Sequence, residues 1–407
     1  MQSLIQLLGP ALEIFHQHAI LSVGILLLVG YFLGKLFETI RLPAITGYIL
    51  AGLVLGNSVT GIIDAQMGTS LSSITEIALG LIALTIGGEF SITKIKQTGL
   101  NILVLTLFEA IFAYIFVTSF LILFGVNTPI AFLLGAISAA TAPAATVVII
   151  KELRARGKFI DYLYGVVAFD DAMCVILFSI TFALVSPALT GVAVKGEIFS
   201  SILELALSLV IGITGGFLIH MLTIKKYRIN EIMLISLSIL FLVSSLSMIF
   251  HLSLLIANMA MGATIINLSP KNRRIFTIIE PLTPPIFALF FILAGTQLDI
   301  SIFANGTVVM LGIIYIASRF MGKFSGITLA GTITKVPKKI RNFLGFCLFP
   351  QAGVAIGLAL FIQTYQIASS SLPELSIIVN IVLLSVFINE LVGPIISKFG
   401  LKHGADL

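Results

Sequence analysis

The sequence predicts an all-α polytopic membrane protein with thirteen transmembrane helices, and three observations support this fold class. Of the 407 residues, 58% are hydrophobic and only 10% are charged, whereas soluble domains carry roughly 25% charged residues. Apolar stretches long enough to cross a bilayer recur along the whole chain, and the basic residues gather in every second loop between them. Nothing near the N-terminus matches a cleaved signal peptide, so the first apolar stretch, from about Ala19, is expected to remain as a membrane helix.

Taken in order, the predicted helices follow the apolar stretches. A membrane-spanning helix needs about 20 predominantly apolar residues. By this criterion the spans are centred near residues 28, 50, 81, 112, 139, 173, 209, 241, 260, 287, 318, 353 and 387, and residues 1–18 form an amphipathic lead-in.

The basic residues orient these spans in the membrane, because loops that face the cytoplasm collect Lys and Arg. Alternate loops hold 20 of the 23 basic residues, and the opposite loops hold only Lys195. This pattern predicts an N-terminus outside and a C-terminus inside the cell. The formal charge of +5 is thereby explained by topology, so membrane lipids and not nucleic acid are the expected surroundings. Two basic residues, Arg319 and Lys323, lie inside a predicted span.

The second half of the chain resembles the first, at offsets of about 210 residues. Because corresponding segments are seven spans apart, an odd number, the two halves must enter the membrane in opposite directions. Inverted repeats of this kind are a common construction of secondary transporters, whose binding site lies at the repeat interface. The matching pairs are "GLVLGN" (52–57) with "GATIIN" (262–267), "GGEFSI" (87–92) with "GTQLDI" (295–300), and Pro143 with Pro350.

Two spans contain a proline in mid-span, Pro143 in the fifth and Pro350 in the twelfth. Proline removes a backbone donor and disfavours helix in the preceding residue, so we expect two discontinuous helices. Their corresponding places in the two repeats predict that they cross, with free carbonyls and half-helix ends directed at one point. A simple packing kink is the alternative. Thr141, Thr146 and Gln351 flank the breaks, either as neutral ion ligands or as partners of freed backbone groups.

Asp170 and Asp171 stand side by side in the sixth span, within "GVVAFDDAMCVILFSI" (165–180). A carboxylate at the bilayer centre costs about 2.5–3.5 kcal/mol on insertion scales, so it indicates function by default. Neighbours on a helix project about 100° apart, so the two aspartates are expected to have different roles.

The two intramembrane cations are the natural partners for one of these aspartates. Arg319 and Lys323 are four residues apart and therefore share a helical face. An intramembrane cation that meets a carboxylate lowers the cost of burying both. Arg319 is placed deeper in the span and is expected to be the better partner, whereas Lys323 either pairs or extends toward the cytoplasmic side.

The aspartate left unpaired explains a transport function. A free carboxylate in a partly desolvated pocket can exchange a proton for a cation near neutral pH, and competition of the two ions for one carboxylate makes an antiporter. Carboxylate, hydroxyl and carbonyl oxygens suit a hard monovalent cation such as Na⁺. Neither an enzymatic activity nor a cofactor is expected beyond the transported ions.

The chain resembles the cation:proton antiporter family 2, within the sodium/proton exchanger superfamily, along essentially its whole length. The segments that carry the resemblance are "GYILAGLVLG" (47–56), "SAATAPAATVVIIKELRARG" (138–157), "AFDDA" (168–172), "FILAGTQLD" (291–299), "PQAGVAIGLAL" (350–360) and "INELVGP" (388–394).

This resemblance implies a homodimer in the plasma membrane, expected to be a prokaryotic inner membrane, with a scaffold and a mobile core that carries the ion by an elevator movement. It implies that Asp171 binds the cation or proton and that Asp170 pairs with a basic residue in the span of Arg319. The expected division is 1–100 and 231–304 for scaffold and dimerisation helices, 101–186 and 305–398 for the ion-transport core, 187–230 for a linker helix and 399–407 for a cytoplasmic tail.

Two departures from the family pattern bear on the transported ion. Kef-type potassium exporters resembling this chain usually carry Gln-Asp in place of Asp170-Asp171 and append a nucleotide-binding regulatory domain, which is not expected here because the sequence reaches only Leu407. The sodium-exchanging branch is therefore favoured, with K⁺/H⁺ exchange as the alternative. Electrogenic relatives often place a lysine opposite the first aspartate, and an arginine there would hold its proton permanently.

Several further residues are candidates for supporting roles. Glu390, in "INEL", occupies roughly the place in the second repeat that "FDDA" has in the first, and it either gates the site or is buried among satisfying neighbours. Glu109, in the fourth span, is the next candidate. Cys174 and Cys347 have no spacing typical of a disulfide framework or a metal site, so both are interpreted as structural.

Two other functions use intramembrane carboxylates. An intramembrane aspartyl protease needs two aspartates close enough to share a proton, normally from two helices, whereas Asp299, the other candidate, lies at a membrane edge. A cation channel should show a continuous polar lining, whereas the polar residues here cluster at one depth. Both alternatives are therefore disfavoured.

Overall fold

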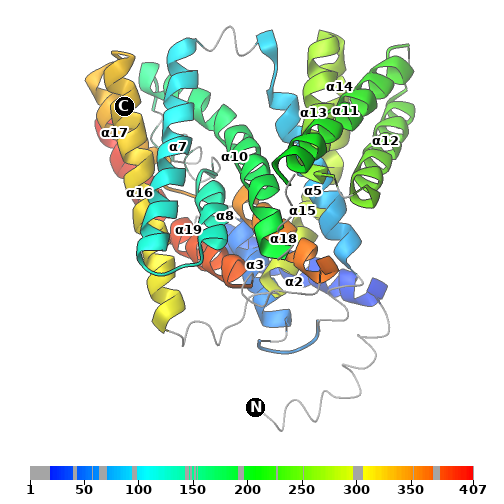
Figure 1. Cartoon of the computed structure of the whole chain (residues 1–407), viewed down its shortest axis with the longest axis horizontal. Helices are drawn as coiled ribbons and strands as arrows, with labels where there is room; N and C mark the ends of the chain where they lie inside the picture. Colours follow the sequence, from blue (N-terminus) through cyan, green and yellow to red (C-terminus); the bar gives the residue numbers. More distant parts are fainter. Residues whose placement is uncertain are drawn as a thin grey trace.

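The structure is a computed structural model, shown in Figure 1. It describes residues 19–39, 44–56, 58–63, 71–93, 99–142, 146, 149–150, 153, 155–190, 197–225, 228–250, 252–296, 306–351, 353–369 and 376–406. Within these residues the fold is helical and contains no strand, only the isolated bridges Gly56–Ile63 and Arg156–Asp406.

Helices make up nearly all of the described chain, and most of them are long and apolar. In order they are α2 (Ala19–Thr39), α3 (Ala44–Leu55), α5 (Ser72–Glu89), α7 (Leu100–Leu123), α8 (Thr128–Ser138), α10 (Lys158–Thr190), α11 (Glu197–Thr223), α12 (Ile229–Ile249), α13 (Leu254–Leu268), α14 (Arg273–Ile279), α15 (Thr283–Thr296), α16 (Gly306–Ile333), α17 (Lys338–Cys347), α18 (Gly353–Ser369) and α19 (Ser376–Gly404), with short 3₁₀ turns at Pro270–Asn272 and Glu280–Leu282.

Length and composition identify the fold as that of a membrane protein. Among the described residues, nine helical segments are long and apolar enough to cross a bilayer, and four shorter apolar helices accompany them: Ala44–Leu55, Thr128–Ser138, Leu254–Leu268 and Gly353–Ile362. Large apolar side chains such as Ile20, Leu123 and Ile395 are mostly exposed, as expected of a surface that faces lipid. A helix covers or directly adjoins each of the thirteen predicted centres. The number of thirteen spans and their orientation stay predictions.

The helices pack in two groups; in Figure 1, α7, α8, α16 and α17 of one group lie on the left, and α5, α11, α12, α13 and α14 of the other lie on the right. Helices α7, α8, α16, α17, α18 and α19 pack mainly against one another, together with α10. Helices α2, α3, α5, α11, α12, α13, α14 and α15 form the other group, and α10 contacts both. The first group contains the segments expected to form the transport core, and the second contains those expected to form the scaffold together with α11, the expected linker helix, which packs against α13. The division into domains stays a prediction. The relative movement of the two groups stays a prediction.

Two helices of the first group are interrupted where the sequence predicts breaks. Helix α8 ends at Ser138 and residues 139–142 are not helical; α17 ends at Cys347 and α18 begins at Gly353. The two ends are 209 residues apart, close to the repeat offset. The Ala142 amide donates to the Pro350 carbonyl at 2.9 Å, so the breaks touch. Pro143 lies outside the described residues, and the crossing of the two helices and the inversion of the repeats stay predictions.

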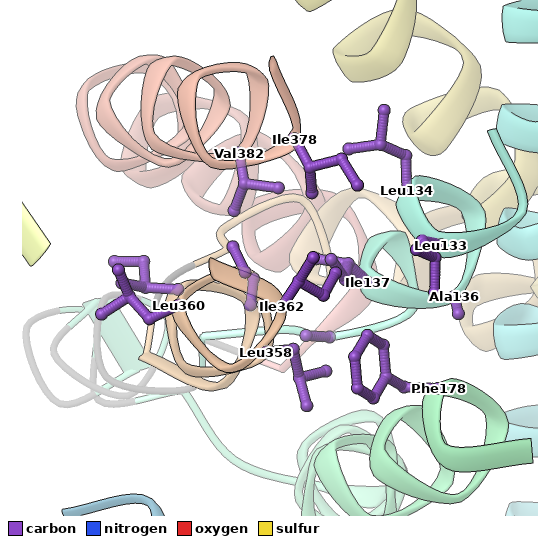
Figure 2. Packing of buried hydrophobic residues seen from close by; sticks show 14 of the residues in the cluster. Leu133, Leu134, Ala136, Ile137, Phe178, Leu358, Leu360, Ile362, Ile378 and Val382 are labelled. Atoms are coloured by element: carbon purple, nitrogen blue, oxygen red, sulfur yellow. The ribbon is translucent and has the colours of Figure 1, made fainter. Parts of the chain in front are cut away.

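An apolar cluster holds these half-helices in place. Figure 2 shows Ile137 of α8 beside Leu358 and Ile362 of α18, and Leu134 of α8 beside Ile378 of α19, all in one buried cluster. All five side chains are fully buried. Inside a bilayer, where lipid is as apolar as these side chains, close van der Waals packing of this kind is what stabilises contacts between helices.

Candidate functional site

Lys323 is the centre of a buried polar cluster next to the first break. Its side chain is 1% exposed, and its ammonium donates to the carboxylates of Glu109 (2.6 Å) and Asp170 (3.3 Å). It also donates to the Ala139 carbonyl at 2.6 Å and the Thr141 hydroxyl at 2.8 Å. One cation thus joins α7, α10, α16 and the non-helical residues that follow α8.

Two glycines of α16 bring Glu109 within reach of Lys323. A Cβ atom at Gly322 would lie 2.6 Å from the Phe112 carbonyl oxygen, and one at Gly326 would lie 2.6 Å from that of Phe108. Both distances are too short for any larger residue, so α7 and α16 approach backbone to backbone along this face. Glu109 and Lys323 lie on these facing surfaces.

Arg319, one turn before Lys323, binds the backbone of both breaks. Its guanidinium donates to the carbonyls of Ser138 (2.8 Å), Ala140 (2.6 Å) and Phe349 (2.6 Å), with longer contacts to Leu348 and Pro350. These carbonyls lose their helical donors where α8 and α17 end. Arg319 therefore replaces the missing amides of two interrupted helices with one buried side chain.

The predicted pairing of Asp170 with Arg319 is wrong, because Lys323 and not Arg319 contacts Asp170. Lys323 does not extend toward the cytoplasm either, since it is buried. The reason lies in the shape of the two cations. A guanidinium presents five donors in a planar fork and satisfies several carbonyls at once, whereas an ammonium is a compact charge suited to a small carboxylate cluster. The partner of Asp170 is therefore a lysine, and not an arginine that would hold its proton permanently.

Asp171 faces different surroundings from its neighbour, as helical spacing predicts. Asp170 is fully buried, whereas part of Asp171 reaches the surface of the protein. Its Oδ1 atom is nevertheless buried and has no hydrogen-bond partner in the described part of the chain. The Thr141 backbone N–H points toward its carboxylate. One part of the Asp171 side chain is thus accessible from the protein surface, and one of its carboxylate oxygens is buried without a hydrogen-bond donor in the described chain. An exchangeable ion requires both a route to the carboxylate and an oxygen that can bind it.

The charges of this site do not balance. Glu109, Asp170 and Asp171 supply three negative charges when ionised, and Lys323 and Arg319 supply two positive charges. Asp170 and Lys323 are close enough to Asp171 to act on it electrostatically. A low-dielectric site strongly disfavours an uncompensated charge, so one proton or one monovalent cation is needed for neutrality.

Among the hydrogen bonds of the described residues, Gln351 and Thr146 bind freed backbone groups and not Asp171. The Gln351 amide donates to the Ile137 carbonyl at 3.1 Å and to the Tyr315 hydroxyl at 3.0 Å. Thr146 donates to the Cys347 carbonyl at 3.1 Å. Of the interpretations left open by the sequence, partnership with freed carbonyls is the one this geometry matches.

Some residues of the polar core were not identified from the sequence. Ser385 and Asn389 of α19 donate to the Gln351 carbonyl oxygen at 3.1 and 3.3 Å, which completes its hydrogen bonding. Tyr315 lies one turn before Arg319, so the i, i+4 spacing was a signal that could have revealed it. Cys174 donates to the Ala136 carbonyl and is buried, in agreement with a structural role. Asp299 lies outside the described residues.

The backbone role of Arg319 predicts a loss of stability in Arg319→Lys. A lysine reaches fewer carbonyls than a guanidinium, and each buried carbonyl left without a donor costs roughly 1–3 kcal/mol. We expect a lower melting temperature for the purified variant. Arg274→Lys is the matched control, because Arg274 donates to a single carbonyl, that of Thr223, at 2.8 Å. Equal losses in the two variants would contradict the role assigned to Arg319.

Comparisons with known proteins agree with this architecture. A family model described as "Sodium/hydrogen exchanger, transmembrane" matches residues 24–398. The solved structure of the sodium proton antiporter MjNhaP1 from Methanocaldococcus jannaschii superposes with a TM-score of 0.74, covering 95% of this chain and 98% of that one. The sequence identity is 18%, so this likeness concerns the fold.

Two curated relatives are similar in sequence. A glutathione-regulated potassium-efflux system protein from Haemophilus influenzae is 26% identical over 335 residues, which is 78% of this chain and 51% of the relative. The Na⁺/H⁺ antiporter 1 of Methanocaldococcus jannaschii is 24% identical over 173 residues, 41% of this chain and 40% of the relative. The matched part is thus about half of the first relative and less than half of the second. Within the described residues, no group of three or more His, Cys, Asp or Glu residues is arranged to hold a metal ion.

Proposed function

Because this chain belongs to the sodium/hydrogen exchanger family of multi-pass membrane transporters, we propose that it exchanges a monovalent cation for protons and that the cation is Na⁺. Cation and proton compete for Asp171. The sequence-based assignment of the family is confirmed, and the family consists of transporters and not of enzymes.

The observation that carries the proposal is the charge imbalance around Asp171. The Glu109, Asp170 and Asp171 carboxylates carry one negative charge more than the Lys323 and Arg319 cations can offset. Either ion restores neutrality, and the two cannot both do so at once. Such competition couples the movements of the two ions in opposite directions, which is the defining property of an antiporter.

The groups around Asp171 suit a hard cation as the ion that competes with the proton for this carboxylate. The available group is the oxygen pair of the Asp171 carboxylate, one atom of which has no hydrogen-bond partner in the described chain, and oxygen ligands suit alkali metal ions. The adjacent pair Asp170-Asp171 favours Na⁺. K⁺/H⁺ exchange is the second candidate, since a curated relative of this chain is named as a potassium-efflux system protein.

Transport by this route requires alternating access. We propose that the group containing α7, α8, α10 and α16–α19 moves as one body against the other group, which forms the dimer contact. The continuous packing of α7 with α16 and of α17 with α19 supports a rigid moving body. A homodimer is part of this proposal.

The experiment is a flux assay with purified protein in liposomes. An inward Na⁺ gradient is expected to drive proton efflux, with a weaker response to K⁺, and the KM for Na⁺ is expected to rise as the pH falls, because protons then occupy Asp171. A larger response to K⁺ supports the second candidate. Cation flux that neither saturates nor moves protons indicates a channel and refutes the proposal.

A further inference from the structure

Glu390 of α19 is a buried carboxylate that the site around Asp171 does not use. Its side chain is 1% exposed, and neither Oε1 nor Oε2 has a hydrogen-bond partner in the part of the chain that the structure describes. Buried polar side chains in proteins are nearly always hydrogen-bonded, so an unpartnered one calls for an explanation. Within a membrane, an ionisable side chain is by default a functional candidate.

The position of Glu390 places it beside both breaks. Its neighbour Asn389 binds Gln351, and a Cβ atom on Gly393, one turn further, would lie 3.0 Å from Pro350 of the second break. Ser397 is seven residues beyond Glu390 and therefore on nearly the same face of α19. The Ser397 hydroxyl lies 3.4 Å from that of Thr146, which follows the first break.

No cation of the packed elements neutralises Glu390 in the described structure. Arg319 and Lys323 of α16 are engaged by the break carbonyls and by Glu109 and Asp170. Helices α8 and α18 carry no charged residue. The other charged groups are Lys338, Lys339 and Arg341 near the start of α17, and Lys398, Lys402 and His403, which follow Glu390 on α19 by at least two turns. The remaining titratable residues of these helices are Tyr315 of α16, which accepts from Gln351, Cys347 of α17, which donates to the Ser397 carbonyl at 3.8 Å, and Tyr365 of α18.

The Glu390 carboxylate lacks a hydrogen-bond donor among the described residues. Both carboxylate oxygens accept hydrogen bonds, and Pro394 deprives the Glu390 backbone carbonyl of the amide that would bind it in a regular helix. Asn389 Oδ1 is a further buried acceptor without a partner in the described chain. An ionised carboxylate among acceptors alone is strongly disfavoured. A bound proton removes the charge and supplies the donor.

We propose that Glu390 is a second exchangeable proton site of this protein, separate from Asp171 and located beside the breaks. The proton binds a carboxylate oxygen while α19 is closed around the side chain, and it leaves to water when the breaks become accessible in the cycle. The inference rests on the proposed function in one respect, since the release step belongs to a transport cycle.

The first test measures protonation directly and does not require transport. Infrared difference spectra of the purified protein are recorded between acidic and alkaline buffer. Wild type is expected to show the carbonyl stretch of a protonated carboxylic acid that Glu390→Gln lacks. Glu76→Gln, which removes a half-buried glutamate from α5, is the matched control and should keep this band. Identical spectra for wild type and Glu390→Gln would overturn the proposal.

The second test measures the number of protons exchanged per cation in liposomes, from the gradients at which net flux vanishes. We expect Glu390→Gln to remain active and to exchange about one proton fewer per cation than wild type. An unchanged stoichiometry in an active Glu390→Gln would refute the exchange step. If that variant does not fold, Glu390→Asp keeps the carboxyl and is expected to shift the pH at which the infrared band disappears; an unshifted band would refute the assignment. If wild type shows no coupled exchange, the proposed function is refuted. The infrared spectra still test whether Glu390 binds a proton.

Discussion

Asp171→Asn is expected to abolish coupled exchange, to the level of liposomes without protein. Asparagine preserves the size of the side chain and its acceptor oxygen, but it can neither bind a proton in this pH range nor provide a negative charge for a cation. The remaining carboxylates of Glu109 and Asp170 are then matched by Lys323 and Arg319, so the site is neutral without any ion. The measurement is cation-driven proton movement in liposomes.

Asp161→Asn provides the control for this prediction. Asp161 is an exposed aspartate in the first turn of the same helix, α10, so its replacement changes the same functional group outside the site. It should exchange ions at a rate close to that of wild type. The melting temperature of Asp171→Asn should be equal to or higher than that of wild type, because an unsatisfied buried charge is removed. Exchange by Asp171→Asn at the wild-type rate would place the transport site elsewhere.

Lys323→Met is expected to cause the largest loss of stability among single substitutions in the site. The variant leaves two fully buried carboxylates, Glu109 and Asp170, without the ammonium that both contact. Removing one partner of a buried ion pair costs about 3–5 kcal/mol, because the remaining charge stays desolvated. The measurement is thermal unfolding of the purified protein, at a pH where wild type is stable.

A double substitution separates lost charge pairing from lost packing. Glu109→Gln in the Lys323→Met background removes one of the two uncompensated carboxylates, so we expect it to recover part of the lost melting temperature. In the wild-type background the same Glu109→Gln should destabilise, since the contact of 2.6 Å with Lys323 is lost. If the two substitutions prove simply additive, Glu109 and Lys323 do not interact energetically.

The candidate site shows what could be predicted from the sequence and what could not. Asp170, Asp171, Arg319 and Lys323 were identified because each ionisable group interrupts a long apolar stretch, a signal that is local. The partner of Asp170 was predicted incorrectly. Arg319 and Lys323 share a helical face, so the sequence could separate them only by their position along the span, and that position favoured Arg319, which is further from the end of the span. Which of the two cations pairs with Asp170 depends on where the carbonyls of the two breaks lie, and the packing of helices from distant parts of the sequence decides that position.

Glu109 illustrates the same limit. In the sequence it is one glutamate among several near the membrane, and nothing local separates it from Glu204 or Glu280. In the fold it makes the shorter of the two carboxylate contacts of Lys323. That contact exists because Gly322 and Gly326 allow α16 to approach α7 closely, a consequence of shape that becomes visible once two distant helices are placed together.

Apolar length, the distribution of Lys and Arg and the two mid-span prolines were sufficient to indicate a helical transporter with interrupted helices. These properties are additive along the chain, since the bilayer acts as a solvent on each segment separately. The assignment of charges to partners required the folded protein. Pairing energies inside a membrane depend on distances of a few ångströms between side chains far apart in sequence, and packing sets those distances.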